Sequence, residues 1–251
     1  MKRVFITGCN GNLARTIIPL LVDIGYHVDG CDIHDFQSEE FLASKDLGLD
    51  TYFKVDLAKV EDVEEMFHQY LGQTIPFALI NNAAVDFVPR SDIVADGLDI
   101  SQFQEIMDVN IAAPTIASTL FFKHWSSMGK CGRIINISSI YSYIVPNERI
   151  YEKGFRKNIL YGVSKAGLNA VSKYFAMIGA PHNIHSNTLL FGGVESNAQS
   201  EIFKKNYSRA NPKGRLMNKG EIFEPIKFLL AEDNTYTNGA EIRVDGGHSI
   251  V

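Results

Sequence analysis

Cysteine is scarce in this sequence, and the few cysteines present are not arranged in pairs. Only Cys9, Cys31 and Cys131 occur among 251 residues, an odd count with no C-x-x-C spacing. This pattern argues against a disulfide framework and implies no metal site. We therefore expect reduced thiols in a reducing compartment, for which the cytoplasm is the default location, and no bound metal.

Long apolar runs and blocks of like charge are also missing. The opening MKRVFITG has only a very short apolar run before Gly8, much too short for the core of a signal peptide. No stretch approaches the roughly 18 apolar residues that a membrane span needs. The 24 basic and 29 acidic residues give a formal net charge of -5 without a basic stripe. The sequence thus predicts neither a membrane nor a nucleic acid as partner.

The chain does contain enough apolar residues, 45% of the total, for a large core. Length alone leaves one or two domains open, but no linker, repeat or low-complexity tract divides the sequence. Apolar runs that resemble strands alternate with amphipathic segments: VFIT, TIIPLLVDI, YHVDGCD, FALINNAA, RIINISSI and IHSNTLL. TIIPLLVDI also belongs to ARTIIPLLVDIGY, which has helical spacing. The alternation predicts a single α/β domain over 1–251, with a doubly wound parallel sheet in three α/β/α layers.

A loop that contains glycine follows the first predicted strand. In VFITGCNGNLA, Gly8 and Gly11 lie between an apolar strand and a segment with helical spacing. Glycine lets the backbone approach a ligand, and the free N–H groups and dipole at a helix start favour a pyrophosphate. Ordinary turns also contain glycine, so the loop alone leaves a nucleotide site and a plain turn equally open.

Two acidic residues follow later strands at positions suited to an adenosine. Asp32 ends the run YHVDGCD, 25 residues after Thr7, where a carboxylate accepts hydrogen bonds from a ribose and repels a 2′-phosphate. NAD is therefore favoured over NADP. Asp56, in the string VDLA, could meet the adenine edge, although an Asp after a strand is commonly a helix cap.

The stretch YGVSK puts the phenol of Tyr161 and the ammonium of Lys165 four positions apart, on one face of a predicted helix. Oxidation of an alcohol needs a base for the hydroxyl proton, but free tyrosine has a pKa near ~10. An ammonium about 4 Å away, in an effective dielectric near 20, lowers that pKa by about two to three units before desolvation opposes it. The alternative is an exposed helical pair, which is ordinarily the better interpretation of Y-x-x-x-K.

Five strings in order extend the pattern along the chain: FALINNAA, MDVNIAA, GRIINISS, YGVSK and TNGAEIRVDGG. In this order they resemble the short-chain dehydrogenase/reductase family over essentially the whole chain. The resemblance implies a Rossmann-type fold, a nicotinamide cofactor and reversible alcohol–carbonyl oxidoreduction. It places the catalytic tetrad at Asn110, Ser139, Tyr161 and Lys165. Ser139 would hydrogen-bond the carbonyl oxygen, and Asn110 would hold a proton-relay water beside Lys165.

Structural alternatives remain open for single members of this set, since Asn110 could bend a helix and Ser139 could end a strand. Asn81 and Asn82 are expected to bond neighbouring strand backbone, with Ala83 small enough for the adenosine side to pack close. Cofactor contacts are expected at sixteen positions: Gly8, Asn10, Gly11, Asn12, Leu13, Asp32, Asp56, Leu57, Asn82, Ala83, Ala84, Tyr161, Lys165, Gly192, Val194 and Ser196.

The sequence departs from the family pattern at two turns. Asn12 and Ala14 stand where compact members carry glycine, so the loop resembles the TG-x-x-G-x-x-A of the longer epimerase and dehydratase branch. Length favours the compact branch, because only 86 residues follow Lys165. In FGGVES, Phe191 replaces the usual proline. After this turn we expect a mobile segment at about 194–215 that covers the substrate.

The third departure is an insertion at about 141–160, because Ser139 and Tyr161 lie 22 residues apart. Compact members have a gap near a dozen. This irregular stretch resembles that of bacterial enzymes of surface-glycan and nonulosonic-acid sugar pathways. It carries four basic residues that could receive a phosphate or merely solvate a loop: Arg149, Lys153, Arg156 and Lys157.

Our first hypothesis is an NAD-dependent oxidoreductase that interconverts a hydroxyl and a ketone on a small polar substrate, a sugar or sugar phosphate. The alternatives are a nucleotide-sugar epimerase or dehydratase that recycles bound NAD, and a dinucleotide-sensing protein without turnover. By resemblance we expect a homotetramer or dimer, with NAVSKYFAMIG presenting an apolar face at the interface or belonging to the core.

Overall fold

The computed structural model describes residues 2–34, 48–87 and 97–251. Within these residues, seven strands form one sheet with the order β3-β2-β1-β4-β5-β6-β7, and every neighbouring pair is parallel. The strands are β1 (Arg3–Thr7), β2 (His27–Asp32), β3 (Leu49–Lys54), β4 (Ala78–Asn81), β5 (Gly132–Ser139), β6 (Ile184–Phe191) and β7 (Glu241–Val244). The prediction of a doubly wound parallel sheet is confirmed.

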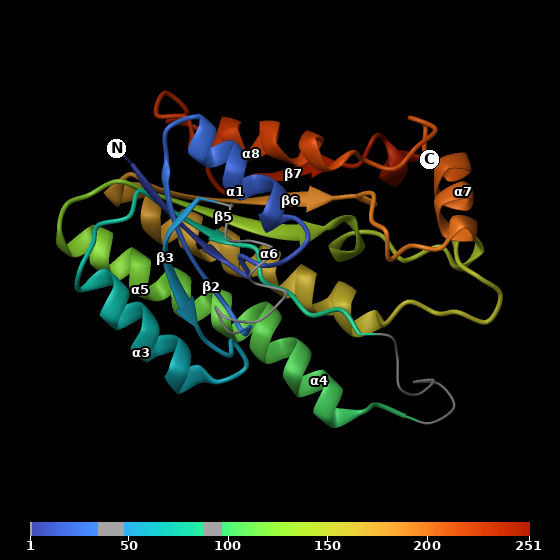
Figure 1. Ribbon diagram of the computed structural model, residues 1–251, viewed down its shortest axis with the longest axis horizontal. Coiled ribbons are helices and arrows are strands. Elements are labelled where there is room, and N and C mark those ends of the chain that lie inside the picture. The colour runs from blue at the N-terminus through green and yellow to red at the C-terminus, as the bar shows by residue number, and fades with distance from the viewer. Residues whose placement is uncertain (1, 35–47, 88–96) are drawn as a thin grey trace.

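Helices cover both faces of the sheet and make the three layers visible in Figure 1. One face carries α1 (Ala14–Asp23) and α8 (Phe223–Leu230), and the other carries α3 (Val60–Leu71), α5 (Ala113–Ser127) and α6 (Ile159–Gly179). α4 (Ile100–Met107) runs into α5 through a π-helical turn, Asp108–Ala112. α7 (Glu201–Ala210) lies beyond the carboxyl ends of the strands. None of the described helices is long and apolar enough to cross a membrane.

Side-chain alternation along the strands divides the core into two layers. In β1, Val4 and Ile6 pack with α1 and α8, whereas Phe5 packs with α3 and α5 on the other face. Successive strand residues point to opposite faces, so a strand that is covered on both sides must be apolar throughout. This requirement explains why the strand signals in the sequence are continuous apolar runs.

TIIPLLVDI is the one apolar run whose composition predicts the wrong element. Although it is rich in β-branched residues, it forms α1, in which Ile17, Ile18 and Leu21 are fully buried. Their helical spacing places them on one face against the sheet. The periodicity of ARTIIPLLVDIGY was therefore the better signal than its β propensity.

A charged cluster lies inside the sheet near its amino end. Asp29 of β2 is fully buried and accepts two hydrogen bonds from Arg3 Nη1, at 2.7 and 2.8 Å, and one from the Tyr70 hydroxyl at 2.8 Å. The hydrogen bond to Asp29 raises the pKa of Arg3, and burial raises the pKa of Tyr70. A buried carboxylate of this kind is tolerated only because a cation and a hydroxyl satisfy it.

Removal of Arg3 should therefore destabilise the fold strongly. We expect Arg3→Met to lower the free energy of unfolding by about 3 kcal/mol, because it leaves the Asp29 charge buried with only a neutral donor. Urea unfolding at neutral pH measures this change. Lys2→Met is the matched control, since the Lys2–Glu232 pair is at the surface and should contribute less than about 1 kcal/mol. Equal losses in the two variants would contradict the argument.

Candidate active site

The strand order reverses between β1 and β4, and a crevice opens there at the carboxyl edge of the sheet. A cavity of about 800 Å³ occupies this edge. Ten of the predicted site residues line it: Asn12, Leu13, Asn82, Ala84, Ser139, Tyr161, Lys165, Gly192, Val194 and Ser196. Side chains from the two ends of the predicted site thus meet in one space.

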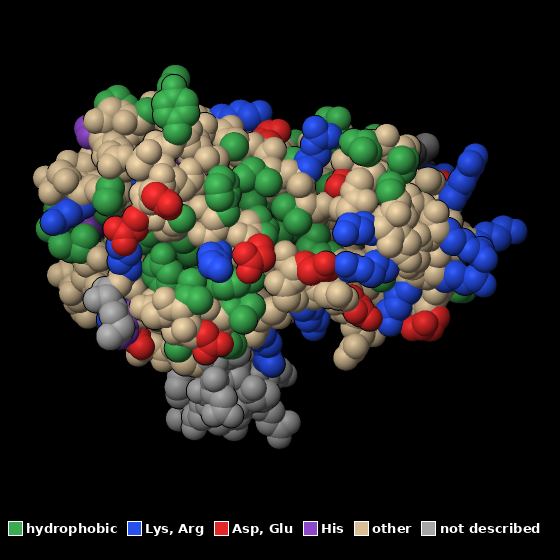
Figure 2. Space-filling view, turned by 90° about the horizontal axis from the view of Figure 1, so that it is seen from above, with side chains coloured by type: hydrophobic (Ala, Val, Ile, Leu, Met, Phe, Trp, Pro, Cys, Tyr) green, Lys and Arg blue, Asp and Glu red, His purple; other side chains and the backbone are tan. Residues whose placement is uncertain are grey.

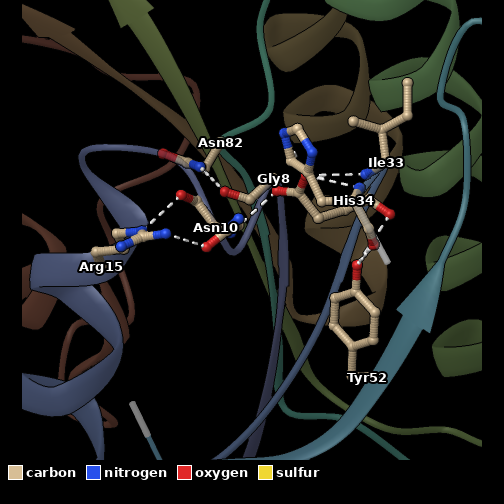
Figure 3. Close-up of polar contacts among 8 residues, drawn as sticks. Gly8, Asn10, Arg15, Ile33, His34, Tyr52 and Asn82 are labelled. Atoms are coloured by element: carbon tan, nitrogen blue, oxygen red, sulfur yellow. Dashed lines mark hydrogen bonds and ion pairs between the residues drawn. The ribbon is translucent and has the colours of Figure 1, made fainter. Parts of the chain in front are cut away.

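The loop after β1 is held tightly against the loop after β4. Gly8 has φ 63°, and a Cβ built on it would lie 2.8 Å from the Cα of Ala83, so only glycine fits there. The Asn82 side chain donates hydrogen bonds of 3.0 Å to the carbonyls of Thr7 and Gly8. Figure 3 shows Asn82 beside Gly8 and Asn10. This close approach leaves the Gly8–Leu13 loop exposed to the cavity on its other side.

Asn81 behaves differently from the expectation that it bonds strand backbone. Its Nδ2 donates to the side chains of Asn136, at 2.8 Å, and Ser118, at 3.2 Å. Both partners are buried, because β4 lies in the middle of the sheet under α5. Only Asn82 bonds backbone, as predicted for the pair.

The start of α1 suits a pyrophosphate. Its N-cap, Leu13, makes no capping side-chain hydrogen bond, and the N–H groups of Asn12 and Leu13 have no acceptor among the described residues. Both residues line the cavity. Free N–H groups and the positive end of the helix dipole together bind phosphate oxygens. The residues present therefore fit a dinucleotide.

Asp32 ends β2 at the position expected for a ribose contact, but its carboxylate already bonds the protein. It accepts hydrogen bonds from the N–H groups of Asn10 at 2.9 Å, Ile33 at 2.8 Å and His34 at 3.4 Å. A carboxylate has about four acceptor positions, so one remains. Figure 3 shows Arg15 beside Asn10, to which it donates two hydrogen bonds. Asp32 thus orders the loop as well as offering a charge.

Two further predicted contacts have structural partners. Asp56 accepts a hydrogen bond of 3.0 Å from the N–H of Ala58, as a turn-forming Asp does. Leu57 is buried in the core layer under α3. Neither lines the cavity. Their contact with an adenine stays a prediction.

Tyr161 and Lys165 lie in the first two turns of α6, which begins after Asn158 because that side chain caps the N–H of Leu160 at 3.0 Å. Lys165 is only 2% exposed. Its Nζ donates to the carbonyl of Ile137 at 2.8 Å and lies 5.7 Å from the centre of the Tyr161 ring. Ser139 ends β5 and accepts a hydrogen bond from the N–H of Tyr141 at 3.1 Å.

The pKa of Tyr161 does not follow the sequence-based expectation. Burial raises it first and the charge of Asp86 raises it further, while a hydrogen bond with Ser139 lowers it. Burial also lowers the pKa of Lys165 to about 8. We expected the ammonium to lower the pKa of the phenol, but desolvation of the two groups outweighs their attraction at this separation.

Asn110 lies in the π-helical turn and is fully buried. Its Nδ2 donates to the Val85 carbonyl at 2.9 Å and to the Ser164 hydroxyl at 3.0 Å, and its Oδ1 accepts from the Val85 N–H at 2.8 Å. One acceptor position of the amide is left for a water. The water-holding role stays a prediction. Through these hydrogen bonds the side chain connects the loop after β4 to α6.

The turn after β6 closes the cavity on the nicotinamide side of the predicted site. A Cβ on Gly193 would lie 2.7–2.9 Å from atoms of Leu216 and Tyr207, and the Gly193 N–H donates to the Tyr207 hydroxyl at 2.7 Å. The Val194 carbonyl accepts from the Gln199 side chain at 2.9 Å. Residues 194–215 therefore pack by specific contacts and include α7; their mobility stays a prediction.

The predicted insertion supplies part of the cavity wall. Between β5 and α6 the structure has two short 3₁₀ turns, Ile140–Ser142 and Glu148–Ile150. Of the four basic residues proposed there as phosphate contacts, Lys157 alone lines the cavity, and it is paired with Asp86. Arg156 instead pairs with Glu148 outside it, at 3.2 Å. A phosphate inside the cavity could therefore be contacted by Lys157 alone, and the exposed positions of the other three fit the alternative of a solvated loop.

Basic side chains gather at the end of the molecule that carries α7 (Figure 2). Within α7, Phe203 and Tyr207 line the cavity, whereas Lys205 and Arg209 are exposed and lie two positions further on. Residues two apart in a helix project about 200° apart. These two cations therefore face away from the cavity.

Sequence reasoning did not identify several residues that line the cavity. Aromatic rings make one wall, with Tyr151 5.0 Å from Phe155 and 5.3 Å from Phe203, centre to centre. The hydroxyls of Tyr141 and Tyr151 are 2.7 Å apart. The concentration of aromatics in YSYIVPNERIYEKGF was the available signal. Asp86 gave none, because it lies outside every motif.

The described residues contain no cluster of His, Cys, Asp and Glu that could hold a metal ion. Cys9 and Cys31 are buried and Cys131 is exposed, all three as free thiols, and burial raises the pKa of the first two. What the cavity brings together is a phenol, an ammonium and a serine hydroxyl beside a helix start. This set can move a proton at an alcohol or carbonyl next to a bound dinucleotide.

Comparison with known proteins finds relatives along the whole chain. The sequence profile of the family described as enoyl-(acyl carrier protein) reductase matches residues 10–249. The chain is 26% identical over 258 residues to 2-dehydro-3-deoxy-D-gluconate 5-dehydrogenase of Escherichia coli, covering 98% of this chain and 94% of that protein. It is 28% identical over 254 residues to L-xylulose reductase of Bos taurus, covering 98% and 96%.

Solved structures agree with these relatives. The crystal structure of a short-chain dehydrogenase from Leptospira borgpetersenii with bound NAD+ superimposes with a TM-score of 0.85 at 28% identity. The match covers 99% of this chain and 92% of that one. The two chains therefore share their fold over nearly their whole length.

The lowered pKa of Lys165 predicts a pH dependence of stability. Between pH 8, near its folded pKa, and 10.5, its ordinary value, the unfolded chain holds a proton that the folded chain has lost. Stability should therefore rise with pH across this window. Relative to Lys165→Met, the parent should gain about 3 kcal/mol in unfolding free energy, measured by urea unfolding without nucleotide. A difference between the two proteins that is constant with pH would contradict the assignment.

Proposed function

The chain belongs to the short-chain dehydrogenase/reductase family and is an NAD(P)-dependent oxidoreductase, and from this premise we propose that it interconverts a hydroxyl and a ketone on a sugar or sugar phosphate, with NAD as cofactor. The observation that carries the proposal is the convergence of Ser139, Tyr161 and Lys165 on one cavity beside the uncapped start of α1.

In the proposed oxidation, Tyr161 is the base that takes the hydroxyl proton. Ser139 holds the substrate oxygen by a hydrogen bond, which strengthens as charge develops on that oxygen. Lys165, fixed by the Ile137 carbonyl, supplies a positive charge that favours the phenolate. Asn110 retains one acceptor position through which a relay water can be held. In reduction the same phenol donates the proton to the carbonyl oxygen.

The dinucleotide supplies the hydride acceptor when it is bound. The pyrophosphate would be held by the N–H groups of Asn12 and Leu13, and the nicotinamide end by Gly192, Val194 and Ser196. Tyr161 and Lys165 line the same cavity. Asp32 supports NAD, because its negative charge would repel a 2′-phosphate on the adenosine ribose. Its one open acceptor position suits a ribose hydroxyl.

The cavity wall supports a sugar as substrate. Partly exposed rings of Tyr151, Phe155 and Phe203 offer flat apolar surfaces to the C–H face of a sugar ring. Asp86 and Glu152, which also line the cavity, can accept hydrogen bonds from hydroxyls. Relatives named for gluconate and xylulose chemistry support the same class. Tyr151, Glu152 and Phe155 come from the 141–160 segment, which we connect with surface-glycan and nonulosonic-acid sugar pathways.

An exposed stripe along α6 supports a homo-oligomer. Val163, Tyr174 and Met177 are 48%, 57% and 66% exposed, on the helix face turned away from the sheet. Apolar side chains left in water on one helix face favour association with a second copy. We propose a dimer or tetramer in the cytoplasm, with residues 194–215 covering the bound substrate.

Replacement of the proposed base gives the direct test. Tyr161→Phe should lower kcat/KM for NAD-dependent oxidation about 10³-fold, because a general base is lost while the ring remains. NADH absorbance measures the rate with a panel of xylitol, sorbitol, gluconate, glucose 6-phosphate and a nucleotide sugar. Binding of NAD, followed by calorimetry, should change little. Tyr143→Phe is the matched control, since Tyr143 is exposed and does not line the cavity.

Other outcomes favour other functions. Full activity of Tyr161→Phe would exclude the proposed base. Copurified NAD with a changed nucleotide sugar and no net NADH would support the epimerase or dehydratase that the TG-x-x-G-x-x-A loop resembles. NAD binding with no turnover of any panel member would support a sensor.

Cofactor selectivity tests Asp32. Asp32→Asn removes the charge and keeps one oxygen that can still accept the Asn10 N–H, while the N–H groups of Ile33 and His34 lose their acceptor. We expect the ratio of kcat/KM for NAD to that for NADP to fall about tenfold, as a charge repulsion of about 1.4 kcal/mol is lost. Asp62→Asn is the control, because Asp62 is an exposed carboxylate of α3 that does not line the cavity. An unchanged ratio in Asp32→Asn would remove the argument for NAD.

A further inference from the structure

A second lysine lies beside the ring of Tyr161. Lys157, Tyr161 and Lys165 are spaced four residues apart, on either side of the start of α6. The Nζ atoms of Lys157 and Lys165 lie 5.1 and 5.7 Å from the centre of the Tyr161 ring. Lys165 belongs to the Y-x-x-x-K motif, whereas Lys157 comes from the 141–160 insertion.

Lys157 is held in place by a carboxylate. It forms an ion pair and hydrogen bond with Asp86, which lies in the loop after β4. Their side chains are 19% and 32% exposed, so the pair is partly desolvated, and both residues line the cavity. A charge in such a place interacts with its neighbours more strongly than one at the open surface.

We propose that the Asp86–Lys157 ion pair is a positioning pair that sets the proton affinity of Tyr161, with the lysine cancelling the carboxylate charge that would otherwise oppose the phenolate. The proposal rests on the proposed function, because it assigns Tyr161 the acid/base step. Both residues act through Tyr161 and take no part in the proton transfer itself.

The surroundings of the phenol explain why this pair matters. The groups that face Tyr161 come from the loop after β4, the end of β5, the 141–160 segment and α6. They are Asp86, Ser139, Tyr141, Tyr151, Lys157 and Lys165. Asp86 is the only carboxylate among them, and it raises the pKa of Tyr161 and of Lys165. Lys157 is the cation in direct contact with that carboxylate. Loss of Lys157 leaves the negative charge of Asp86 uncompensated next to the phenol. Loss of Asp86 leaves the positive charge of Lys157 uncompensated there.

The two single variants should therefore shift the pH profile in opposite directions. Lys157→Met leaves Asp86 unpaired, so the midpoint of the rise of kcat/KM with pH should move up by about one unit. Asp86→Asn leaves Lys157 unpaired, so the midpoint should move down by about one unit. The double variant should return close to the parent, and Lys157→Arg should retain the parent midpoint.

The measurement is NADH formation between pH 6 and 10, with whichever member of the panel of xylitol, sorbitol, gluconate, glucose 6-phosphate and a nucleotide sugar the parent oxidises fastest. Lys153→Met serves as the matched control, because Lys153 is an exposed cation of the same insertion that does not line the cavity. Its profile should match the parent. Thermal unfolding of each variant separates a folding defect from a change in proton affinity.

Opposite shifts that cancel in the double variant support the proposal. Midpoints within 0.2 unit of the parent, or shifts of the same sign, overturn it, because a merely structural pair would not reverse sign with the charge removed. If Tyr161→Phe remains active, or the parent oxidises no member of the panel, the proposed function fails and the inference with it. Unchanged midpoints together with an inactive Tyr161→Phe overturn the inference alone.

Discussion

The contact between two backbone segments at the centre of the sheet fixes everything else about the site. Parallel pairing of β1 with β4 brings their carboxyl ends together, and Thr7 Oγ1 accepts hydrogen bonds of 3.1 Å from the N–H groups of Asn82 and Ala83. Gly8 can approach Ala83 this closely only because it lacks a Cβ. The loop is thereby turned outward, so α1 starts with its free N–H groups directed at the cavity. A side chain at Gly8 would separate the two segments and remove the crevice.

The reacting groups depend on a second constraint, which is desolvation. Lys165 lies in α6, and its ammonium is buried against β5, where the Ile137 carbonyl accepts its hydrogen bond. Burial lowers its pKa to about 8. The same burial raises the pKa of Tyr161. Each group is thus shifted toward its neutral form, and the pair stays poised for proton exchange only if nearby charges offset that tendency. The charges at the cavity mouth, Asp86 and Lys157, are consequently part of the electrostatic balance of the phenol.

The fold was largely predictable because its signals are local. Apolar runs with strand length, and helical periodicity between them, gave the element types and the parallel sheet. TIIPLLVDI was ambiguous because β-branched composition and helical spacing conflict, and packing of Ile17 and Leu21 on the sheet decided for the helix. Tyr161 and Lys165 stood out by their helical spacing, whereas Ser139 was found through the resemblance of its string to the family.

The remainder of the site depends on contacts between distant segments, which spacing does not encode. Asp86 meets Lys157 across 71 positions of sequence, and nothing near either residue indicates the partner. The pKa of Tyr161 was predicted with the wrong sign because the attraction of Lys165 is visible in the sequence, whereas burial is not. Likewise four basic residues of the insertion looked equivalent as phosphate contacts, and only the path of the 3₁₀ turns separates Lys157 from the others.

The two ends of the cavity are built in different ways, and this has a consequence for how the protein can change. The end that we propose for the cofactor includes the start of α1 and the glycine turn after β6, which follow directly from strands of the sheet. The substrate end consists of side chains, Tyr151, Phe155 and Phe203, carried by the insertion and α7 outside the sheet. Replacing one of these rings alters the pocket shape without moving a strand. Selectivity for substrate can therefore vary while the position of Tyr161 and the dinucleotide cradle stays constant.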